Sequence, residues 1–246
     1  MELKEHPFLN GAYYFDGLPD GTETMTEKGE MYDDTTEGDA MEPEYLYSQV
    51  FNSEVNNPFV FKAEGNVTVG NGEIMALASL TQALSQGQFG QYPLVIFTDE
   101  GLYAASISNT GIITAVHPMS REVLNNVRSV TQTDGAVFFS SAKGLMVVDG
   151  SEVRCLSEQL NGRSDAPFQT YLKTAHIAYD YRDSLLWIFN GGVNCYLYSI
   201  KNGTFSRYTF ASPVTNVVNC YPDYLLQDNR KKVFSLMKRA NINNDP

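Results

Sequence analysis

The chain has 246 residues, and 17 Lys and Arg against 29 Asp and Glu give it a formal net charge of −12. This length suits one large domain or two small ones, and 43% hydrophobic with 19% charged residues excludes a disordered chain. The chain has no basic stripe, and phosphate contacts need clustered Lys and Arg, so the composition also excludes a nucleic-acid-binding domain.

The charge is concentrated near the front of the chain. Residues 1–19 are aromatic and turn-rich, with a predicted short strand at 11–15. Residues 20–44 hold ten acids and one lysine, a net charge of −9, which leaves −3 for all other residues. This segment has almost no aliphatic side chains and cannot bury enough apolar surface to fold alone, so we predict an acidic arm or loop. The body of the protein is predicted to follow at 45–246.

The acidic arm offers one hypothesis for a metal site. Asp33, Glu37, Asp39 and Glu44 fall at positions 1, 5, 7 and 12 of a calcium-binding EF-hand loop, with Gly38 at position 6. The flanks do not look helical, and such matches arise easily by chance among ten acids. We therefore expect a solvated or docked arm, with no metal and no other cofactor. Its docking residues would be Asp33, Asp34, Glu37, Asp39, Glu42 and Glu44.

One short helix is predicted near 74–86. Residues 74–84 are rich in Ala and Leu and place apolar side chains at helical spacing at Leu77, Leu80 and Leu84. Gly87 would end this helix. A second short helix is predicted to begin at Ser120, because serine is a preferred N-cap residue.

The remaining chain is predicted to form β-hairpins. An apolar run, a polar turn and a second apolar run recur at 93–104, 136–148, 177–189 and 224–236, and more faintly at 59–69. The second strands open at Val67, Leu102, Leu145, Leu186 and Val233, with spacings of 35, 43, 41 and 47 residues.

A hairpin period near forty residues predicts an all-β, β-propeller-like fold with about five repeats, one blade each. Each repeat should add an outer pair of strands. The clearest pair is 194–200 and 205–210, joined at Asn202-Gly203, because Asn-Gly is a strong hairpin signal. The alternative is a β-sandwich. About five repeats are few for a closed ring, so we expect the propeller to be incomplete, or to be completed by other chains or by missing residues.

Catalytic motifs are missing from the sequence: it has no nucleophile elbow, phosphate-binding loop, zinc-protease motif or dinucleotide fingerprint. The carboxylates Asp99, Glu100, Asp134 and Asp183 lie at predicted hairpin ends, where they could reach a central channel and act as glycosidase acids. Acidic residues are also common in turns, and nothing pairs these four. We therefore predict a protein that is not an enzyme, with a carbohydrate-acting or ligand-binding bacterial propeller as the alternative.

The cysteines indicate a reducing compartment. Cys155, Cys195 and Cys220 form no CxxC pair and are odd in number, so buried thiols are expected. The string Val-Asn-Cys-Tyr at 193–196 and again at 218–221 is predicted to occupy matching strand positions in two repeats. The charged N-terminus and the short apolar runs predict a soluble protein made in a cytosol, without a membrane partner.

A basic cluster lies near the C-terminus. It consists of Arg230, Lys231, Lys232, Lys238 and Arg239. Aromatic residues do not interleave it beyond Phe234, so a solvated chain end or a subunit contact is favoured over a nucleic-acid groove.

Several stretches resemble one protein family. These are 85–104, which runs from Ser85 through the turn Thr98-Asp99-Glu100-Gly101, and then 117–123, 129–140 and 144–145. Their order is similar to that in the β-propeller tail-nozzle or tail-stabilisation proteins of short-tailed bacteriophages and their prophage-derived homologues. In that family an apolar hairpin ending in a Thr/Asp-Gly turn leads through a Pro-Ser segment to the next hairpin. The similarity is clearest over 74–148 and continues as pattern-level agreement up to Leu236.

The resemblance implies a structural virion component that forms a ring, often sixfold, beneath the portal. DNA would pass through the channel of this assembly without being bound by sequence. The implied partners are further copies of the chain and other tail or portal-adjacent proteins. The implied location is the virion tail, after assembly in the host cytoplasm; without the resemblance, a cytoplasmic protein is expected.

Overall fold

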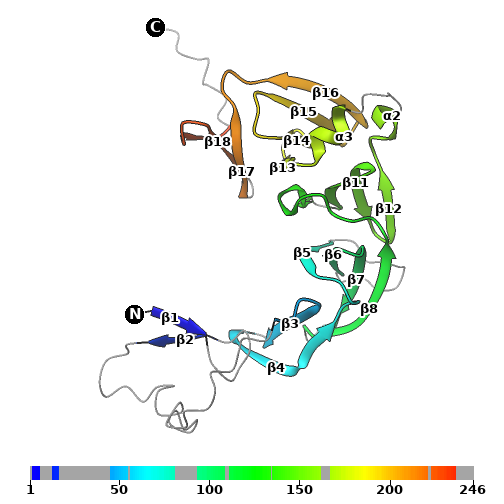
Figure 1. Cartoon of the computed structure of the whole chain (residues 1–246), viewed down its shortest axis with the longest axis vertical. Coiled ribbons are helices and arrows are strands. Elements are labelled where there is room, and N and C mark those ends of the chain that lie inside the picture. The colour runs from blue at the N-terminus through cyan, green and yellow to red at the C-terminus, as the bar shows by residue number, and fades with distance from the viewer. Residues whose placement is uncertain are drawn as a thin grey trace.

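The described residues form small antiparallel sheets that follow one another along an open arc (Figure 1). The structure is a computed structural model, and it describes residues 2–5, 13–16, 45–54, 56–80, 93–108, 111–133, 135–161, 167–220 and 223–236. The acidic arm 20–44, with its EF-hand-like residues, lies outside these ranges, as do Asp134, Lys238 and Arg239.

The described strands make six sheets, in chain order. A two-stranded sheet at the N-terminus contains β1 (Glu2–Glu5) and β2 (Tyr13–Asp16), and a second pairs β3 (Gln49–Glu54) with β4 (Asn57–Thr68). The next three sheets have four strands each. They are β5 to β8 (Ile74–Ser79, Leu94–Thr98, Leu102–Ile107, Ile113–Ser120), β9 to β12 (Thr131–Gln132, Val137–Ser141, Gly144–Asp149, Glu152–Cys155) and β13 to β16 (His176–Asp180, Leu185–Phe189, Asn194–Ser199, Thr204–Thr209). The terminal sheet has three strands, β17 to β19 (Val214–Cys220, Asp223–Asp228, Val233–Phe234).

Within each of the four sheets from β5 to β19, the strands lie side by side in sequence order. The first strands of neighbouring sheets meet on the concave side of the arc, where β9 contacts β5 and β13, and β13 also contacts β17. Figure 1 shows the fourth strands β8, β12 and β16 on the convex side. This arrangement of blades around a common centre is that of a β-propeller, so the predicted all-β, propeller-like fold is confirmed.

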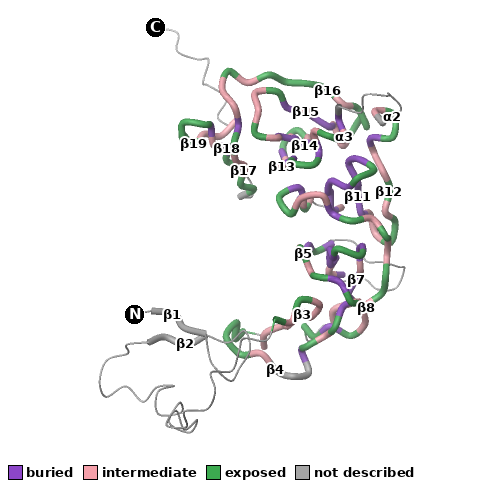
Figure 2. The backbone as a smooth tube through the Cα atoms, in the orientation of Figure 1, coloured by how far each residue is buried: buried purple, intermediate pink, exposed green. Residues whose placement is uncertain are grey.

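The hydrophobic core lies between the sheets, because each cluster of buried side chains joins residues of two neighbouring sheets. Figure 2 shows the buried residues in purple along the strands of these sheets. Phe97 of β6 and Phe139 of β10 meet between the sheets β5–β8 and β9–β12, with ring centroids 5.1 Å apart. The next layer packs Leu145 and Ile188, and α3 (Pro167–Leu172) adds Phe168 to it. The other helical elements are α2 (Glu158–Asn161) and the 3-10 turn η1 (Val127–Ser129). Because each layer needs the sheet on either side, a blade cannot bury its apolar faces alone.

A buried polar side chain closes the turn of four hairpins. Thr98, Ser141, Asp180 and Asp228 each end the leading strand, and each accepts a hydrogen bond from the backbone N–H two residues later, at 2.9–3.2 Å. All four are buried in the structure. The side chain supplies the acceptor that the turn backbone lacks, so the chain reverses between two apolar strands without leaving buried donors unpaired.

The predicted helix near 74–86 is wrong for its described part. Ile74–Ser79 is the strand β5, paired antiparallel with β6 from Ile74 opposite Thr98 to Ser79 opposite Leu94. Ala78 is buried and Leu77 is 49% exposed, which is the alternation of a strand. Pairing with β6 outweighs the helix propensity of Ala and Leu. The helix predicted from Ser120 is also absent, since Ser120 ends β8.

Hairpins are confirmed at 93–104, 136–148, 177–189 and 224–236, and the pair 194–200 with 205–210 is confirmed as β15 and β16. The faint hairpin at 59–69 is wrong, because Asn57–Thr68 is one continuous strand. At Gly65, within β4, an added Cβ would lie 2.8 Å from the carbonyl oxygen of Asn52. The glycine therefore allows β3 to approach closely.

Candidate functional site

The concave side of the arc carries an uncharged pocket of about 460 Å³. Its lining residues come from the first strands of three sheets and from η1 and the link to β9: Ala76, Leu77, Val127, Val130, Thr131, Gln132 and Asn219. The polar members hold neighbouring sheets together. Thr131 Oγ1 donates to the carbonyl of Ile177 at 2.7 Å, and Asn219 Nδ2 donates to the same carbonyl at 3.1 Å. The polar groups of this wall are thus engaged by the protein itself.

The four innermost strands carry almost no charge. In β5, β9, β13 and β17 there is no Lys or Arg, and the only acid is Asp180. The Asp180 carboxylate is buried and accepts from the N–H groups of Arg182 and Asp183 and, at 3.4 Å, from the hydroxyl of Tyr224. These four strands offer no Lys or Arg side chain to a phosphate group.

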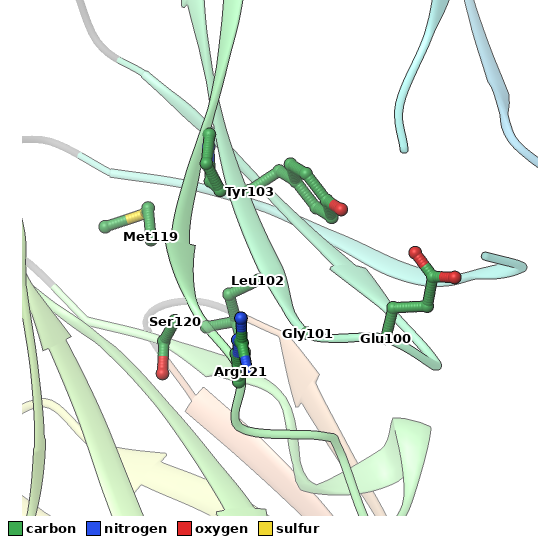
Figure 3. Close-up of a pocket in the computed structure, with 8 residues that line it drawn as sticks. Glu100, Gly101, Leu102, Tyr103, Met119, Ser120 and Arg121 are labelled. Carbon is green, nitrogen blue, oxygen red and sulfur yellow. The ribbon is translucent and has the colours of Figure 1, made fainter. Parts of the chain in front are cut away.

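A second pocket, of about 410 Å³, lies on the β5–β8 sheet, between the β6–β7 turn and the end of β8 (Figure 3). Glu100 and Tyr103 point to one side of it, whereas Met119 and Ser120 point to the other. Arg121 is exposed at its edge. The side chains do not converge on a common point, so this pocket does not present a recognisable binding geometry.

The three described carboxylates considered for catalysis lie in two separate turns of the fold. Asp99 and Glu100 are in the β6–β7 turn, where Asp99 Oδ1 accepts from the N–H of Glu73 at 2.8 Å. Asp183 is in the β13–β14 turn, two sheets further along the arc. Among the described residues there is no group of three or more Asp, Glu, His or Cys side chains close enough to hold a metal ion.

Two of the three cysteines have described side chains, and both are free thiols. Cys195 is buried on β15, and burial raises the pKa of its thiol to about 12. Cys155 is half-buried at the end of β12. The repeated Val-Asn-Cys-Tyr strings do not occupy matching positions, because Cys195 is in the third strand of its sheet and Cys220 ends the first strand of the next.

The terminal sheet has one uncovered apolar face, which we call the terminal face: Val218, Leu225 and Val233, which are 53%, 37% and 56% exposed. Val218 lies opposite Leu225 in the β17–β18 pairing. The adjacent Leu226 points the other way and is fully buried against the β13–β16 sheet. In β10, by contrast, the adjacent Phe138 and Phe139 are both buried, because a sheet lies on either side. The terminal face thus resembles a blade interface that no sheet in the described part of the chain covers.

A basic turn adjoins the terminal face. Arg230, Lys231 and Lys232 connect β18 to β19 and are all exposed, whereas Asp228 at the start of the turn is buried and accepts from the N–H groups of Arg230 and Lys232 at 2.9 Å. The three predicted contact residues that the structure describes are therefore accessible, and they lie beside an apolar surface that the sequence analysis did not identify.

The N-terminal part of the arc, before β3, exposes aromatic side chains. Tyr45 and Tyr47, which directly follow the acidic arm in sequence, are 67% and 58% exposed, and their rings stack with centroids 5.7 Å apart. The β3–β4 sheet also exposes polar and aromatic groups: Asn66 Nδ2 donates to Gln49 Oε1 at 2.7 Å, and Phe59 is 65% exposed. The two ends of the arc are therefore chemically different.

Comparison with solved structures gives propellers, at low identity. Sqt1 of Saccharomyces cerevisiae matches at 12% identity with a TM-score of 0.46, over 75% of this chain and 52% of that one. The Pan2 WD40 domain of Neurospora crassa matches at 10% identity with a TM-score of 0.42, over 78% and 54%. The dihydro-heme d1 dehydrogenase NirN in complex with DHE matches at 10% identity with a TM-score of 0.44, over 78% and 40%. The chain spans about half the length of the first two structures.

No protein-family model and no curated protein sequence matches the chain. Among the described residues, no helix has the length and apolar character needed to cross a membrane. The chain is an all-β protein of the β-propeller type. That class follows from the successive antiparallel sheets, their inner-strand contacts and the core between them.

Proposed function

We propose that this protein is a non-enzymatic structural component of a phage tail, which forms a ring or nozzle through which DNA passes. Its partners would be further copies of itself and neighbouring tail or portal-adjacent proteins. It would be assembled in the host cytoplasm and would reside in the virion tail. The proposal starts from the resemblance of residues 74–148 to the tail-nozzle family.

The observation that carries the proposal is the uncovered terminal face at one end of an open arc. Val218, Leu225 and Val233 expose aliphatic surface on a sheet whose other face is packed, and an exposed apolar patch of this kind favours an association surface. An arc whose two ends differ associates head to tail, and a head-to-tail contact closes into a ring when its rotation permits.

The charge distribution agrees with a channel protein that does not retain DNA. The residues outside the acidic arm still carry a net charge of −3, and the inner strands lack the Lys and Arg that would bind phosphate. DNA would therefore pass such a wall without adhering to it.

The first test is the state of association of the purified full chain. Light scattering coupled to size exclusion, over a concentration range up to about 50 μM, should give a discrete oligomer, because ring contacts of ordinary size have dissociation constants below that range. Negative-stain microscopy should then show rings of uniform diameter. A strict monomer over the whole range would contradict the proposal.

The location is tested separately. Gold-labelled antibody against the chain should decorate the tails of particles produced by the genome that encodes it. Antibody that binds only soluble protein from the same lysate, and no particle, would contradict the placement in a virion.

A further inference from the structure

The terminal face and the basic turn make one continuous surface at the end of the arc. Val233 directly follows Lys232 in the chain. In the β18–β19 pairing Val233 lies opposite Gln227, which directly precedes the buried Asp228. We infer that this surface binds the head of a second copy of the chain, that is, Tyr45 and Tyr47 with the acidic arm that precedes them. This inference rests on the proposed ring and identifies the surfaces that would join its subunits.

The terminal face and the Tyr45–Tyr47 pair both expose apolar surface that an interface could bury. The terminal face offers aliphatic side chains, and Tyr45 and Tyr47 offer two stacked, exposed rings. Tyrosine is enriched in interfaces because it buries a large apolar area at a low cost in side-chain entropy. An interface of standard size buries roughly 800 Å² on each partner. Three partly exposed aliphatic side chains supply only a fraction of that area, so the contact must extend onto the rim.

The rim is where the charges match. Arg230, Lys231 and Lys232 place three exposed cations at one end of the arc, and the Asp228 carboxylate does not offset them toward a partner because it is buried in the turn. The arm that ends at Glu44 carries a net charge of −9. Such complementarity steers association and fixes the orientation of the partner.

The position of the two surfaces favours a second copy over the same chain. Tyr45 leads into β3, in the second of the six sheets, and the terminal face belongs to β17–β19, in the last (Figure 1). Surfaces at opposite ends of an arc meet naturally when one copy follows another. Each copy then contributes one surface of each kind, and the contact repeats around a ring.

The experiment measures association of the full chain by light scattering and sedimentation velocity. In one variant Arg230, Lys231 and Lys232 are replaced by Glu, and in another Val218→Glu places a charge on the terminal face. Each variant should weaken association by roughly 30-fold or more. The wild-type oligomer should also weaken as NaCl rises from about 50 mM to about 500 mM, because salt screens exposed charges.

A matched control carries the same change in charge elsewhere. Lys173→Glu, Arg182→Glu and Lys201→Glu alter three exposed cations of the β13–β16 region and should leave association unchanged. Val123→Glu, at a position that is 38% exposed, controls for Val218→Glu. Circular dichroism on every variant keeps loss of folding distinct from loss of association.

The decisive experiment reverses charges in the acidic arm. A chain with Asp33→Lys, Asp34→Lys and Glu37→Lys should associate poorly alone but should associate with the chain that carries Glu at 230–232. If the triple Glu variant and Val218→Glu both associate as strongly as the wild-type chain, the inference is overturned while the proposed ring stands. A monomeric wild-type chain would overturn both. If the control variant with Glu at 173, 182 and 201 loses as much association as the variant with Glu at 230–232, the inference is also overturned. Net charge alone would then explain the effect.

Discussion

The packing between blades makes Phe139 the most informative position for testing the fold. Its ring is fully buried between the β5–β8 and β9–β12 sheets and meets Phe97 edge to face, at 5.1 Å between centroids and 70° between planes. Phe139→Ala removes this ring from the middle of a layer that both sheets share. The expected loss in the free energy of unfolding is about 4 kcal/mol, of which about 1 kcal/mol belongs to the aromatic pair.

The assay is urea unfolding followed by circular dichroism and by the emission of Trp187, which is the single tryptophan and lies on β14. With a denaturant slope of about 2 kcal/mol/M, the midpoint should fall by about 2 M. Phe59→Ala, at a side chain that is 65% exposed, should change stability by less than about 0.5 kcal/mol. A double-mutant cycle with Phe97→Leu and Phe139→Leu should give a coupling of about 1 kcal/mol. A loss below about 1.5 kcal/mol for Phe139→Ala would refute a shared core between these sheets.

Three further outcomes are expected. Asp180→Ala should lower the free energy of unfolding by about 2–3 kcal/mol, because it removes the hydrogen-bond acceptor of the turn and the contact with Tyr224. Asp180→Asn should retain most of the stability, and equal losses in the two variants would contradict the role of Asp180 in closing the turn. Burial raises the pKa of Cys195 to about 12, so the folded chain keeps a proton that the unfolded chain loses near the ordinary value of 9.0. The free energy of unfolding should therefore fall between about pH 9 and pH 12. The fall should be less steep in Cys195→Ala. Burial and, to a lesser degree, the charge of Arg128 lower the pKa of half-buried His176. Stability should therefore fall as the pH drops below about 6.5, where the histidine of the unfolded chain takes up a proton. If His176→Gln shows the same dependence of stability on acid pH, this histidine is not the cause.

Local pattern was enough to predict most of the strands. The hairpin at 93–104 has an apolar run, the turn Thr98-Asp99-Glu100-Gly101 and a second apolar run, and each of these signals acts over a few residues. The Asn-Gly turn between β15 and β16 is of the same kind, with Gly203 at φ 65°.

The errors arose where distant parts of the chain decide the structure. Ala and Leu in Ile74–Ser79 favour a helix locally, but the edge of β6 supplies backbone partners that the sequence does not reveal. Gly65 resembles a turn glycine until Asn52 is seen beside it. For the candidate site, the basic turn was evident from its composition. The terminal face was not, because Leu225 and Leu226 look alike in sequence, and they differ only in that no sheet of the described residues covers Leu225.

The last strand of the arc has a consequence for how assemblies of this protein would grow. β19 is only two residues long and follows a turn in which Lys231 has a φ of 61°. So short an edge offers few free backbone groups to an incoming strand, and lysine beside it adds a charge that an incoming strand would have to accommodate. Addition by main-chain pairing, the route to open-ended fibrils, is therefore disfavoured. Subunits would add face against face, and the twist between successive blades, repeated at each junction, would set the number that fits before the circle is complete.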